Sequence, residues 1–369
     1  MPLQIIRQDI TRMEVDAIVN PTNELLQPGG GTDAQIHRAA GPELLRATEA
    51  IGELAVGEAV MTPGFRLPCR YVLHTAGPVW QGGQAGEEEQ LRRCYRSCLR
   101  IAGEQGMESL AFPLLSAGTY GFPRDVALRI GTDAIRDYLL EHELDVYLVV
   151  FDPDSYAISQ RLYANIQSFL DEREYGRRMA MAEEAMPLPA MNAEAASRRG
   201  FRMPGRRRTE SARRNREEDV AADLSMPFEQ PAPVLSSVPV RKQAGDSLET
   251  YLQRMGESFR DMLLRKIDEK GMSDAACYKL ANIDRKLFNK IKNQPEYHPG
   301  KTTVLALSLA LRLPEQEMLE MLMKAGYTLS NASRLDLIVQ YFVEHGQYDV
   351  YAINETLFAF GQATLGSAY

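Results

Sequence analysis

Two glycine-rich turns and one acidic residue have the composition of a site for a phosphate ligand. The first turn holds Gly29–Gly31 just ahead of Asp33, and the second runs over Ser116–Gly121. Consecutive glycines let the backbone approach a ligand closely, and free N–H groups at the start of a helix attract phosphate. Two such turns that face each other suit a diphosphate, whose oxygens point to both sides. Asp9, directly after a predicted strand, adds an acid to these loops.

These turns need a scaffold, and the hydrophobic pattern predicts one. We expect strands in five short β-branched runs, namely Leu3–Arg7, Ala17–Val19, Tyr71–His74, Leu110–Phe112 and Val146–Phe151. We expect amphipathic helices between them over Asp33–Ala40, Glu87–Glu104 and Asp125–Leu140. Strands that alternate with helices predict a layered α/β domain with a largely parallel central sheet. Such sheets place ligand sites at the loops beyond the carboxyl ends of their strands.

The order and spacing of the loops resemble one family. The stretches QDIT, VDAIVNPTN, GGGTDAQIHRAAG, GEAVMTPGFRLPCRYVLHTAGP and FPLLSAGTYGFP are similar to the macrodomain family over about residues 1–173. Within it the chain looks most like the MacroD-type ADP-ribosyl hydrolases. Those share an Asn ten residues ahead of an Asp that ends a glycine run, as Asn23 and Asp33 do here. The resemblance implies a layered α/β/α fold with a mixed, largely parallel sheet.

The resemblance also implies a role for each site residue. Asp9 would accept the adenine amine beside the Ile10 N–H, and Phe151 would offer the adenine an apolar face. Asn23 would hydrogen-bond the distal ribose, and Asp33 would orient or activate the attacking water. The other ligand-binding residues would wrap the diphosphate through the backbone or, for the tyrosine, close over the cleft: Gly29, Gly30, Gly31, Ser116, Ala117, Gly118, Thr119 and Tyr120. No cofactor or metal is required; ADP-ribose is the ligand or product.

Two of these side chains, and two histidines outside the site, also have a plainer interpretation. Asp33 could cap its helix, as Asp often does at a helix start. Phe151 could belong to the core, because it is an apolar residue at a strand end. We interpret His37 and His74 as structural, because burial explains most such side chains.

The chain departs from the family pattern at three places. Gln8 stands where a glycine is frequent, and Pro28 stands where another glycine is usual. Pro21 and Thr22 replace the usual alanine pair, which stiffens the loop that presents Asn23.

Residues 174–246 are predicted to be a disordered linker. After Tyr175 this segment has only two aromatic residues, Phe201 and Phe228, and no sustained apolar period, so it cannot bury enough surface to offset the entropy of ordering. Arg198–Arg216 holds nine arginines against one acid, Glu210. A solvated linker is the plainer interpretation, and a tether for nucleic acid or membrane is the alternative.

Residues 247–369 have helical periodicity and form a separate all-α domain in this prediction. We expect helices over Ser247–Lys270, Ser273–Ala281, Asp284–Lys292, Thr302–Leu311, Pro314–Ala325, Ser333–His345 and Ile353–Phe360. Residues 273–313 resemble a Cro/repressor-type helix-turn-helix. Its second helix carries cations and amides that would meet phosphates and base edges, namely Arg285, Lys286, Asn289 and Lys290. The same geometry serves as a packing unit, so DNA binding and protein-partner binding both remain open.

Composition excludes several other classes. The net charge of −8 argues against a surface coated in positive potential for nucleic acid. The first ten residues lack the features of a signal peptide, and no segment has the 18 or more apolar residues of a membrane span, so we expect a cytoplasmic protein without membrane contact. Cys94 and Cys98 lie one helical turn apart without a second ligand pair, which indicates structural thiols rather than a metal site.

Three functions follow from these features. As an enzyme, the protein would hydrolyse mono-ADP-ribose from a modified protein, a nucleic acid or a small ester. As a reader, it would bind ADP-ribose without turnover. As a regulator, it would couple ADP-ribose binding to DNA or to a protein partner through the helical domain. Asn23 with Asp33 favours the enzyme over the reader.

Overall fold

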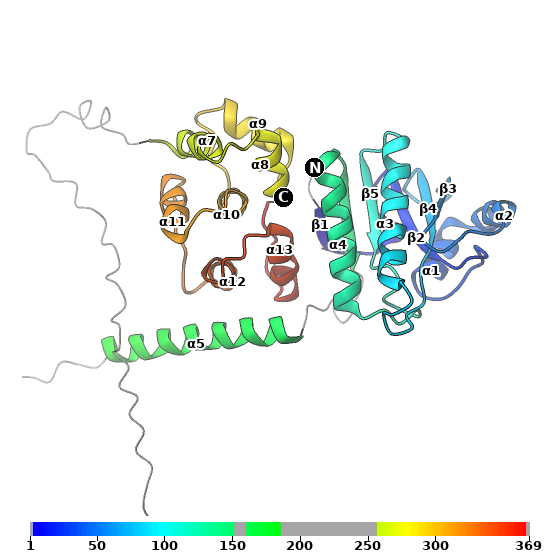
Figure 1. Cartoon of the computed structure of the whole chain (residues 1–369), viewed down its shortest axis with the longest axis horizontal. Coiled ribbons are helices and arrows are strands. Elements are labelled where there is room, and N and C mark those ends of the chain that lie inside the picture. The colour runs from blue at the N-terminus through cyan, green and yellow to red at the C-terminus, as the bar shows by residue number, and fades with distance from the viewer. Residues whose placement is uncertain (1–2, 151–159, 186–256, 367–369) are drawn as a thin grey trace, which may run out of the picture. The chain divides into compact units, whose positions relative to one another are not determined.

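The computed structural model describes residues 3–150, 160–185 and 257–366. Residues 3–150 form an α/β part, the long helix α5 spans Gln160–Ala185, and residues 257–366 form a helical part (Figure 1). Apart from the last residues of α5, these segments belong to one structural unit. No helix among the described residues is long and apolar enough to cross a membrane.

Six strands form the central sheet of the α/β part. Their order is β1-β6-β5-β2-β4-β3, and only β3 runs antiparallel to its neighbour. The bounds are Leu3–Arg7 for β1, Ala17–Thr22 for β2, Ala59–Pro63 for β3, Tyr71–Ala76 for β4, Ser109–Pro113 for β5 and Asp145–Val150 for β6. The predicted mixed, largely parallel sheet is therefore confirmed.

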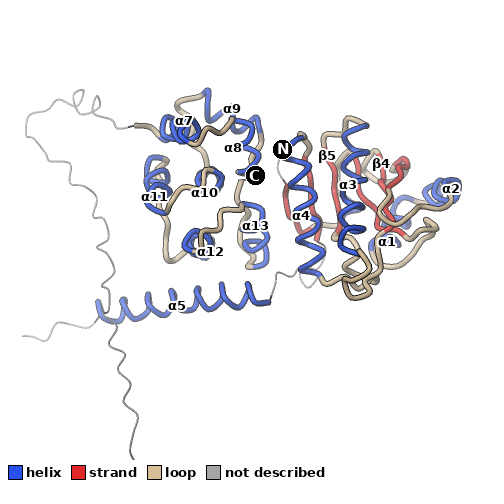
Figure 2. The backbone as a smooth tube through the Cα atoms, in the orientation of Figure 1, coloured by secondary structure: helices blue, strands red, loops and turns tan. Residues whose placement is uncertain are grey.

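Helices cover both faces of this sheet, because its central strands are apolar on both sides (Figure 2). Ile18 of β2 packs toward α1 and α2, whereas its neighbour Val19 packs toward α3 and α4. The helices are α1 (Thr32–Ala40), α2 (Pro42–Ile51), α3 (Glu87–Glu104) and α4 (Arg124–Glu141), with a 3₁₀ turn η1 over Ile10–Arg12. This is the α/β/α layering that the sequence predicts.

The strand β2 is longer than predicted. It continues past Val19 through Pro21 and ends at Thr22, paired with β4 throughout. A proline is tolerated there because the ladder between β2 and β5 reaches only Ile18. The strand β3 and the helix α2 were not predicted. In β3 three of the five residues are only half-buried, so an edge strand of this kind carries a weak apolar signal.

The helical part contains seven helices in its described residues. They are α7 (Phe259–Glu269), α8 (Asp274–Leu280), α9 (Arg285–Asn293), α10 (Lys301–Ala310), α11 (Glu315–Lys324), α12 (Arg334–Glu344) and α13 (Val350–Ala359). Side-chain caps at Ser258, Ser273, Asp284, Ser333 and Asp349 start five of them. The helical character predicted for this region is therefore confirmed.

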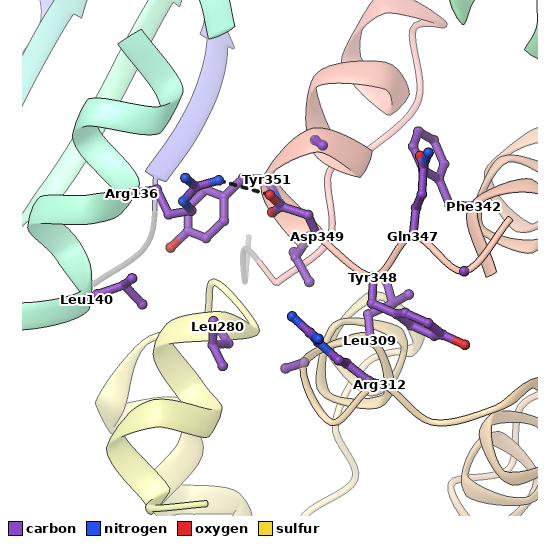
Figure 3. Close-up of a pocket in the computed structure, with 14 residues that line it drawn as sticks. Arg136, Leu140, Leu280, Leu309, Arg312, Phe342, Gln347, Tyr348, Asp349 and Tyr351 are labelled. Atoms are coloured by element: carbon purple, nitrogen blue, oxygen red, sulfur yellow. Dashed lines mark hydrogen bonds and ion pairs between the residues drawn. The ribbon is translucent and has the colours of Figure 1, made fainter. Parts of the chain in front are cut away.

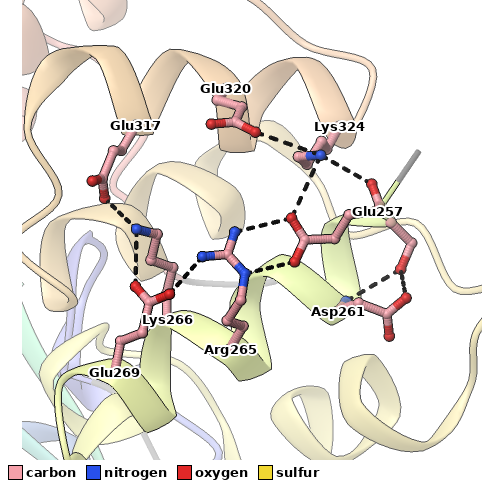
Figure 4. Close-up of polar contacts among 9 residues, drawn as sticks. Glu257, Asp261, Arg265, Lys266, Glu269, Glu317, Glu320 and Lys324 are labelled. Carbon is pink, nitrogen blue, oxygen red and sulfur yellow. Dashed lines mark hydrogen bonds and ion pairs between the residues drawn. The ribbon is translucent and has the colours of Figure 1, made fainter.

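Ion pairs join α7 to α11 on the surface of the helical part (Figure 4). Arg265 bonds Glu257 at 2.7 Å and Glu269 at 2.6 Å, and Lys266 reaches Glu317 on α11 at 2.8 Å. Lys324 on α11 forms an ion pair with Glu257 at 3.6 Å. Each of these charges has a partner from within the chain.

Helix α5 extends into the segment that the sequence assigns to the linker. It ends at Ala185, beyond the predicted boundary at residue 173. Ile166 and Leu170 of α5 are buried in the core of the helical part, and Phe169 meets Tyr341 edge to face. Packing at one end therefore supports a helix whose own apolar pattern is weak. Residues 186–256, which hold the rest of the predicted linker and the start of the predicted Ser247–Lys270 helix, lie outside the described residues.

The α/β part and the helical part contact each other at the edge strand β1. Asn282 follows α8 with a left-handed backbone, φ 54°. Its side chain accepts a hydrogen bond from Leu3 N at 2.8 Å and donates one to Leu3 O at 2.9 Å. An asparagine tolerates this conformation, and here it also satisfies the exposed edge of the sheet.

Candidate functional site

The loops after β2 and β5 meet the start of α1 around a cavity of about 290 Å³. Asn23, Asp33 and Tyr120 line this cavity together with Gly29–Gly31. A smaller cavity of about 150 Å³ continues from it and shares the lining residues Thr32, Leu114 and Gly118. Gln8, Ile10 and Val150 line the far end of the smaller cavity. Together the two cavities form an elongated cleft at the carboxyl ends of the parallel strands.

Asp33 is held at one end of this cleft. Its side chain lies in the first turn of α1 and the residue is 3% exposed. One carboxylate oxygen accepts a hydrogen bond from Asn20 Nδ2 at 2.6 Å, and the other accepts one from Gly29 N at 2.5 Å. The N-cap of α1 is instead Gly31, which makes no side-chain cap. Asp33 therefore fixes the glycine turn against β2, which is a different task from capping its helix.

Asn23 is immobilised by its own loop. Its Oδ1 accepts hydrogen bonds from Leu25 N at 3.0 Å and Gln27 N at 3.2 Å, and its Nδ2 donates to Gln27 O at 2.8 Å. An amide nitrogen carries two protons, so one Nδ2 proton remains to donate to a ligand. The residue lines the same cavity as Asp33.

The second turn presents free backbone donors to the same cavity. Ser116 adopts a left-handed conformation with φ 59°, and hydrogen bonds from Phe122 N to Ser116 O and from Gly121 N to Gly118 O close the turn behind it. In the described part of the chain, Gly118 and Thr119 use their N–H groups for no hydrogen bond. A turn of this form exposes its N–H groups, which is how backbone binds phosphate.

Gly77 lies directly against the second turn. A Cβ atom at this position would lie 2.4 Å from Ser116 Oγ, so a larger residue would require the Ser116 side chain to move. Tyr120 flanks the same region and is half-buried. Burial and the nearby carboxylates of Asp33 and Glu24 raise the pKa of its phenol, so Tyr120 stays protonated.

A buried polar chain stands behind Asp33. Asn20 Nδ2 contacts His74 Nδ1 at 3.1 Å, and His74 Nε2 contacts Thr62 Oγ1 at 2.9 Å. Because the amide nitrogen can only donate, His74 Nδ1 is the acceptor and Nε2 carries the proton. Burial and the neighbouring His37 lower the pKa of His74 to about 3, so the ring is neutral.

His37 also contacts Asp33, although the sequence analysis sets it aside as structural. Its Nε2 lies 3.5 Å from Asp33 Oδ1, one helical turn along α1, and its side chain is 8% exposed. The Asp-to-His spacing of four on a helix is the signal that would have found this pair. Asn20 could have been found from the two-residue alternation of side chains in β2, which places it on the face of the sheet that α1 covers.

Unsatisfied polar atoms gather at this end of the cleft. Seven buried side-chain atoms lack a hydrogen-bond partner among the described residues, and four of them belong to this neighbourhood: Asn20 Oδ1, Thr22 Oγ1, His37 Nε2 and Ser116 Oγ. Buried polar groups are normally paired, so such a concentration marks a place where a ligand or water supplies the partners.

Comparison with known proteins identifies the α/β part. A family model described as Macro domain matches residues 19–131. An O-acetyl-ADP-ribose deacetylase from Salmonella gallinarum is 45% identical over 170 residues, which cover 44% of this chain and 93% of that protein. The chain belongs to the macrodomain family. A macro domain-containing protein from Methanosarcina mazei is also 45% identical, over 155 residues that cover 42% of this chain and 83% of that protein.

A solved structure is also similar to part of the chain. The Oceanobacillus iheyensis macrodomain with ADP is 37% identical, with a TM-score of 0.39, over 46% of this chain and 90% of that one. These four matches each cover less than half of the chain.

Two predicted adenine-binding residues of the macrodomain are not seen in the cleft. Asp9 caps η1, where its Oδ1 accepts from Thr11 N at 2.9 Å and from Thr11 Oγ1 at 2.7 Å, and it lines neither cavity. Phe151 lies outside the described residues. Ile10 and Ala117 do line the smaller cavity. The adenine contacts of Asp9 and Phe151 therefore remain predictions.

The cysteines do not form a site in the macrodomain or beyond it. Cys69, Cys94, Cys98 and Cys277 are buried free thiols, and burial raises the pKa of each. Thiols of this kind are unreactive. Within the described residues, no three His, Cys, Asp or Glu side chains are grouped so as to hold a metal.

A larger cavity of about 560 Å³ lies between α4 of the macrodomain and the helical part (Figure 3). Its polar side chains bond each other. Arg136 reaches Asp349 at 3.0 Å, Asp349 also accepts from Tyr351 N at 3.0 Å, and the Tyr351 hydroxyl donates to Lys279 O at 3.1 Å. Three of the polar residues that line this cavity, Arg136, Asp349 and Tyr351, thus have partners within the chain.

The predicted nucleic-acid residues lie together on α9. Arg285, Lys286, Asn289 and Lys290 are all exposed, and Lys290 Nζ lies 4.2 Å from the centre of the Tyr297 ring. The next cation, Lys292, is bonded to Asp274 at 2.6 Å. The apolar stripe of this helix includes Phe288 and Ile291, and both are buried.

Proposed function

We propose that this protein binds ADP-ribose in the cleft of the macrodomain and hydrolyses the bond that joins the distal ribose to the acyl group of a small ester or to a modified macromolecule. The observation that carries the proposal is Asp33, a buried carboxylate held by Asn20 and Gly29 at the wall of a cavity. The relatives named O-acetyl-ADP-ribose deacetylase, at about 45% identity, support a hydrolase.

The binding step rests on backbone donors. In the described residues, the N–H groups of Gly30 and Gly31 in the first turn, and of Gly118 and Thr119 in the second, form no hydrogen bond. Donors on two sides of the cavity match a diphosphate, and the start of α1 adds a favourable helix dipole. The smaller cavity, lined by Ile10 and Val150, offers the adenine an apolar surface.

The chemical step uses Asp33 as a general base. Asp33 takes a proton from a water molecule, and the water oxygen bonds to the carbon under attack. For an ester this is the acyl carbon. Its bond to the ribose oxygen breaks, the ribose oxygen receives a proton, and the products are ADP-ribose and a carboxylic acid. Asn23 donates its remaining Nδ2 proton to the distal ribose and holds it in place.

Turnover assays with the full chain test this function. The protein is incubated with O-acetyl-ADP-ribose and, separately, with mono-ADP-ribosylated protein and DNA, and free ADP-ribose is measured. We expect release from at least one substrate, and calorimetry with ADP-ribose should give an affinity on the order of micromolar, about −8 kcal/mol. Binding without release from any substrate would favour the reader, and no binding would refute the proposal.

The exposed face of α9 favours a second candidate, a regulator that binds nucleic acid. Arg285, Lys286 and Lys290 would meet phosphates, and Asn289 would meet a base edge. We expect duplex binding by the full chain to weaken with salt, with a slope of roughly −0.9 in log K against log salt for each phosphate contacted. Replacing both lysines by alanine should flatten that slope. Absence of binding at the lowest salt would leave α9 as a surface for a protein partner.

A further inference from the structure

Thr22 is a departure from the macrodomain pattern that the structure places in the cleft. It is the last residue of β2, paired with Ala76 of β4, and it lines the larger cavity beside Asn23 and Asp33. Strand alternation puts its side chain on the same face as Asn20, which is the face that α1 covers. The residue is 4% exposed.

The hydroxyl of Thr22 has no partner among the described residues. Three other buried threonines of the macrodomain do have partners for their hydroxyls. Thr75 Oγ1 donates to Glu58 O at 2.8 Å, Thr48 Oγ1 donates to Leu45 O at 2.9 Å, and Thr62 Oγ1 contacts His74. A buried hydroxyl loses its water on folding and destabilises the protein unless something replaces that water. Valine would fill the same space in a strand without this penalty, so the hydroxyl calls for a partner from outside the chain.

The position of Thr22 indicates which part of a ligand supplies that partner. The smaller cavity, which suits the adenine, is lined by Gln8, Ile10 and Val150 and does not include Thr22. The two cavities join at Thr32 and Gly118, where the glycine turns would hold the diphosphate. Thr22 lines only the larger cavity, whose wall also includes Asn23 and Asp33. A ligand that runs along the cleft therefore presents its distal ribose to this hydroxyl.

We propose that Thr22 is a specificity-determining residue whose buried hydroxyl hydrogen-bonds an oxygen of the distal ribose. The inference rests on the proposed ADP-ribose binding. Its consequence is that the cleft prefers nucleotides with a second ribose beyond the diphosphate over nucleotides that end at the diphosphate.

The test compares ADP-ribose with ADP, which lacks the second ribose, by calorimetry on the full chain. Thr22→Val removes the hydroxyl at nearly constant volume and should weaken ADP-ribose binding about 3- to 10-fold, the effect of one neutral hydrogen bond. ADP binding should change by less than about twofold, since ADP makes no contact with this hydroxyl. Thr22→Ser keeps the hydroxyl and should restore most of the ADP-ribose affinity. Retained ADP binding also shows that the variant is folded.

Thr119→Val is the matched control, because it removes a hydroxyl from the diphosphate side of the same cavity. It should change the two affinities by the same factor. Equal affinities of Thr22→Val and wild type for ADP-ribose would overturn the inference, and so would equal losses for both ligands. Unchanged ADP-ribose affinity with slower hydrolysis would place the hydroxyl at the attacking water instead and would also overturn it. Should Thr22→Val fail to fold, Thr22→Ala serves in its place. Failure of the wild-type chain to bind ADP-ribose would refute the proposed function itself. The outcomes that overturn the inference about Thr22 require a wild-type chain that does bind, so the two failures can be distinguished.

Discussion

The cleft of the macrodomain and the cavity of Figure 3 differ in whether their buried polar groups have hydrogen-bond partners, and size does not reveal this difference. The cavity beside α4 has about 560 Å³ and the larger cavity of the cleft has about 290 Å³. In the cavity beside α4, Arg136 and Asp349 form an ion pair, and none of its described lining residues has a buried side-chain atom without a hydrogen-bond partner. In the larger cavity of the cleft, Thr22 and Ser116 each have one such unpaired atom. Unpaired polar groups therefore mark the site better than volume does.

Removal of the carboxylate at the cleft should have the largest effect. Asp33→Ala should slow hydrolysis by about 10²- to 10⁴-fold, the range for loss of a general base, while ADP-ribose affinity is largely kept because backbone groups hold the diphosphate. Turnover and calorimetry measure the two quantities. Asp349→Ala at the cavity of Figure 3 is the control and should leave turnover unchanged. Normal turnover by Asp33→Ala would mean that this carboxylate only fixes the glycine turn.

Acid should destabilise the protein through His74. The pKa of this histidine falls from 6.5 to about 3 in the folded state, so only the unfolded state takes up a proton between these values. Its contribution to stability is therefore complete above pH 6.5 and is lost as the pH falls toward 3, at about 1.4 kcal/mol per pH unit. Urea unfolding at several pH values should show a shallower acid loss for His74→Gln. An identical slope for the variant and wild type would contradict the neutral, buried imidazole.

Glu355 on α13 should act in the opposite direction. Burial, the largest cause, raises its pKa from 4.5 to about 7, and Asp133 and Asp349 raise it further while Thr132 and Arg136 oppose the shift. The contribution of Glu355 to the free energy of unfolding is complete below pH 4.5 and is lost as the pH rises through 7. The loss is again about 1.4 kcal/mol per pH unit, over a narrower pH range than for His74. Glu355→Gln should remove that loss in the same urea series. A variant that loses as much stability as wild type between pH 5 and 7 would contradict the burial of this carboxyl.

The ion pairs of Figure 4 should contribute least. Arg265 is 44% exposed and its partners are solvated, so water screens the interaction. Arg265→Ala should lower Tm by no more than about 2 °C. The difference from wild type should shrink in about 1 M salt, where the Debye length is about 3 Å. A large loss of Tm, or any change in ADP-ribose affinity, would mean that this surface network does more than join α7 to α11.

The elements of the macrodomain were largely readable from the sequence. Alternation of β-branched and amphipathic runs predicted five of the six strands and three of its helices. The resemblance to the macrodomain family implied a shared site for Asn23 and Asp33, and both residues line the same cavity. The missed strand β3 lies at the edge, where half-burial weakens the pattern. The helix α5 was missed as a whole, because its first half is stabilised by contacts of Ile166 and Leu170 with helices distant in sequence.

The sequence by itself determined the features that depend on neighbouring residues. Glycine turns, helix caps such as Ser273 and the apolar stripe of α9 follow from interactions within about four residues, so their chemistry can be read along the chain. The surroundings of Asp33 depend on tertiary structure. The order β1-β6-β5-β2-β4-β3 brings Asn20, His74 and Thr62 from three strands into one buried chain of hydrogen bonds. Local pattern does not encode which strands become neighbours, because that choice is made by burial of the whole sheet between its two helical layers.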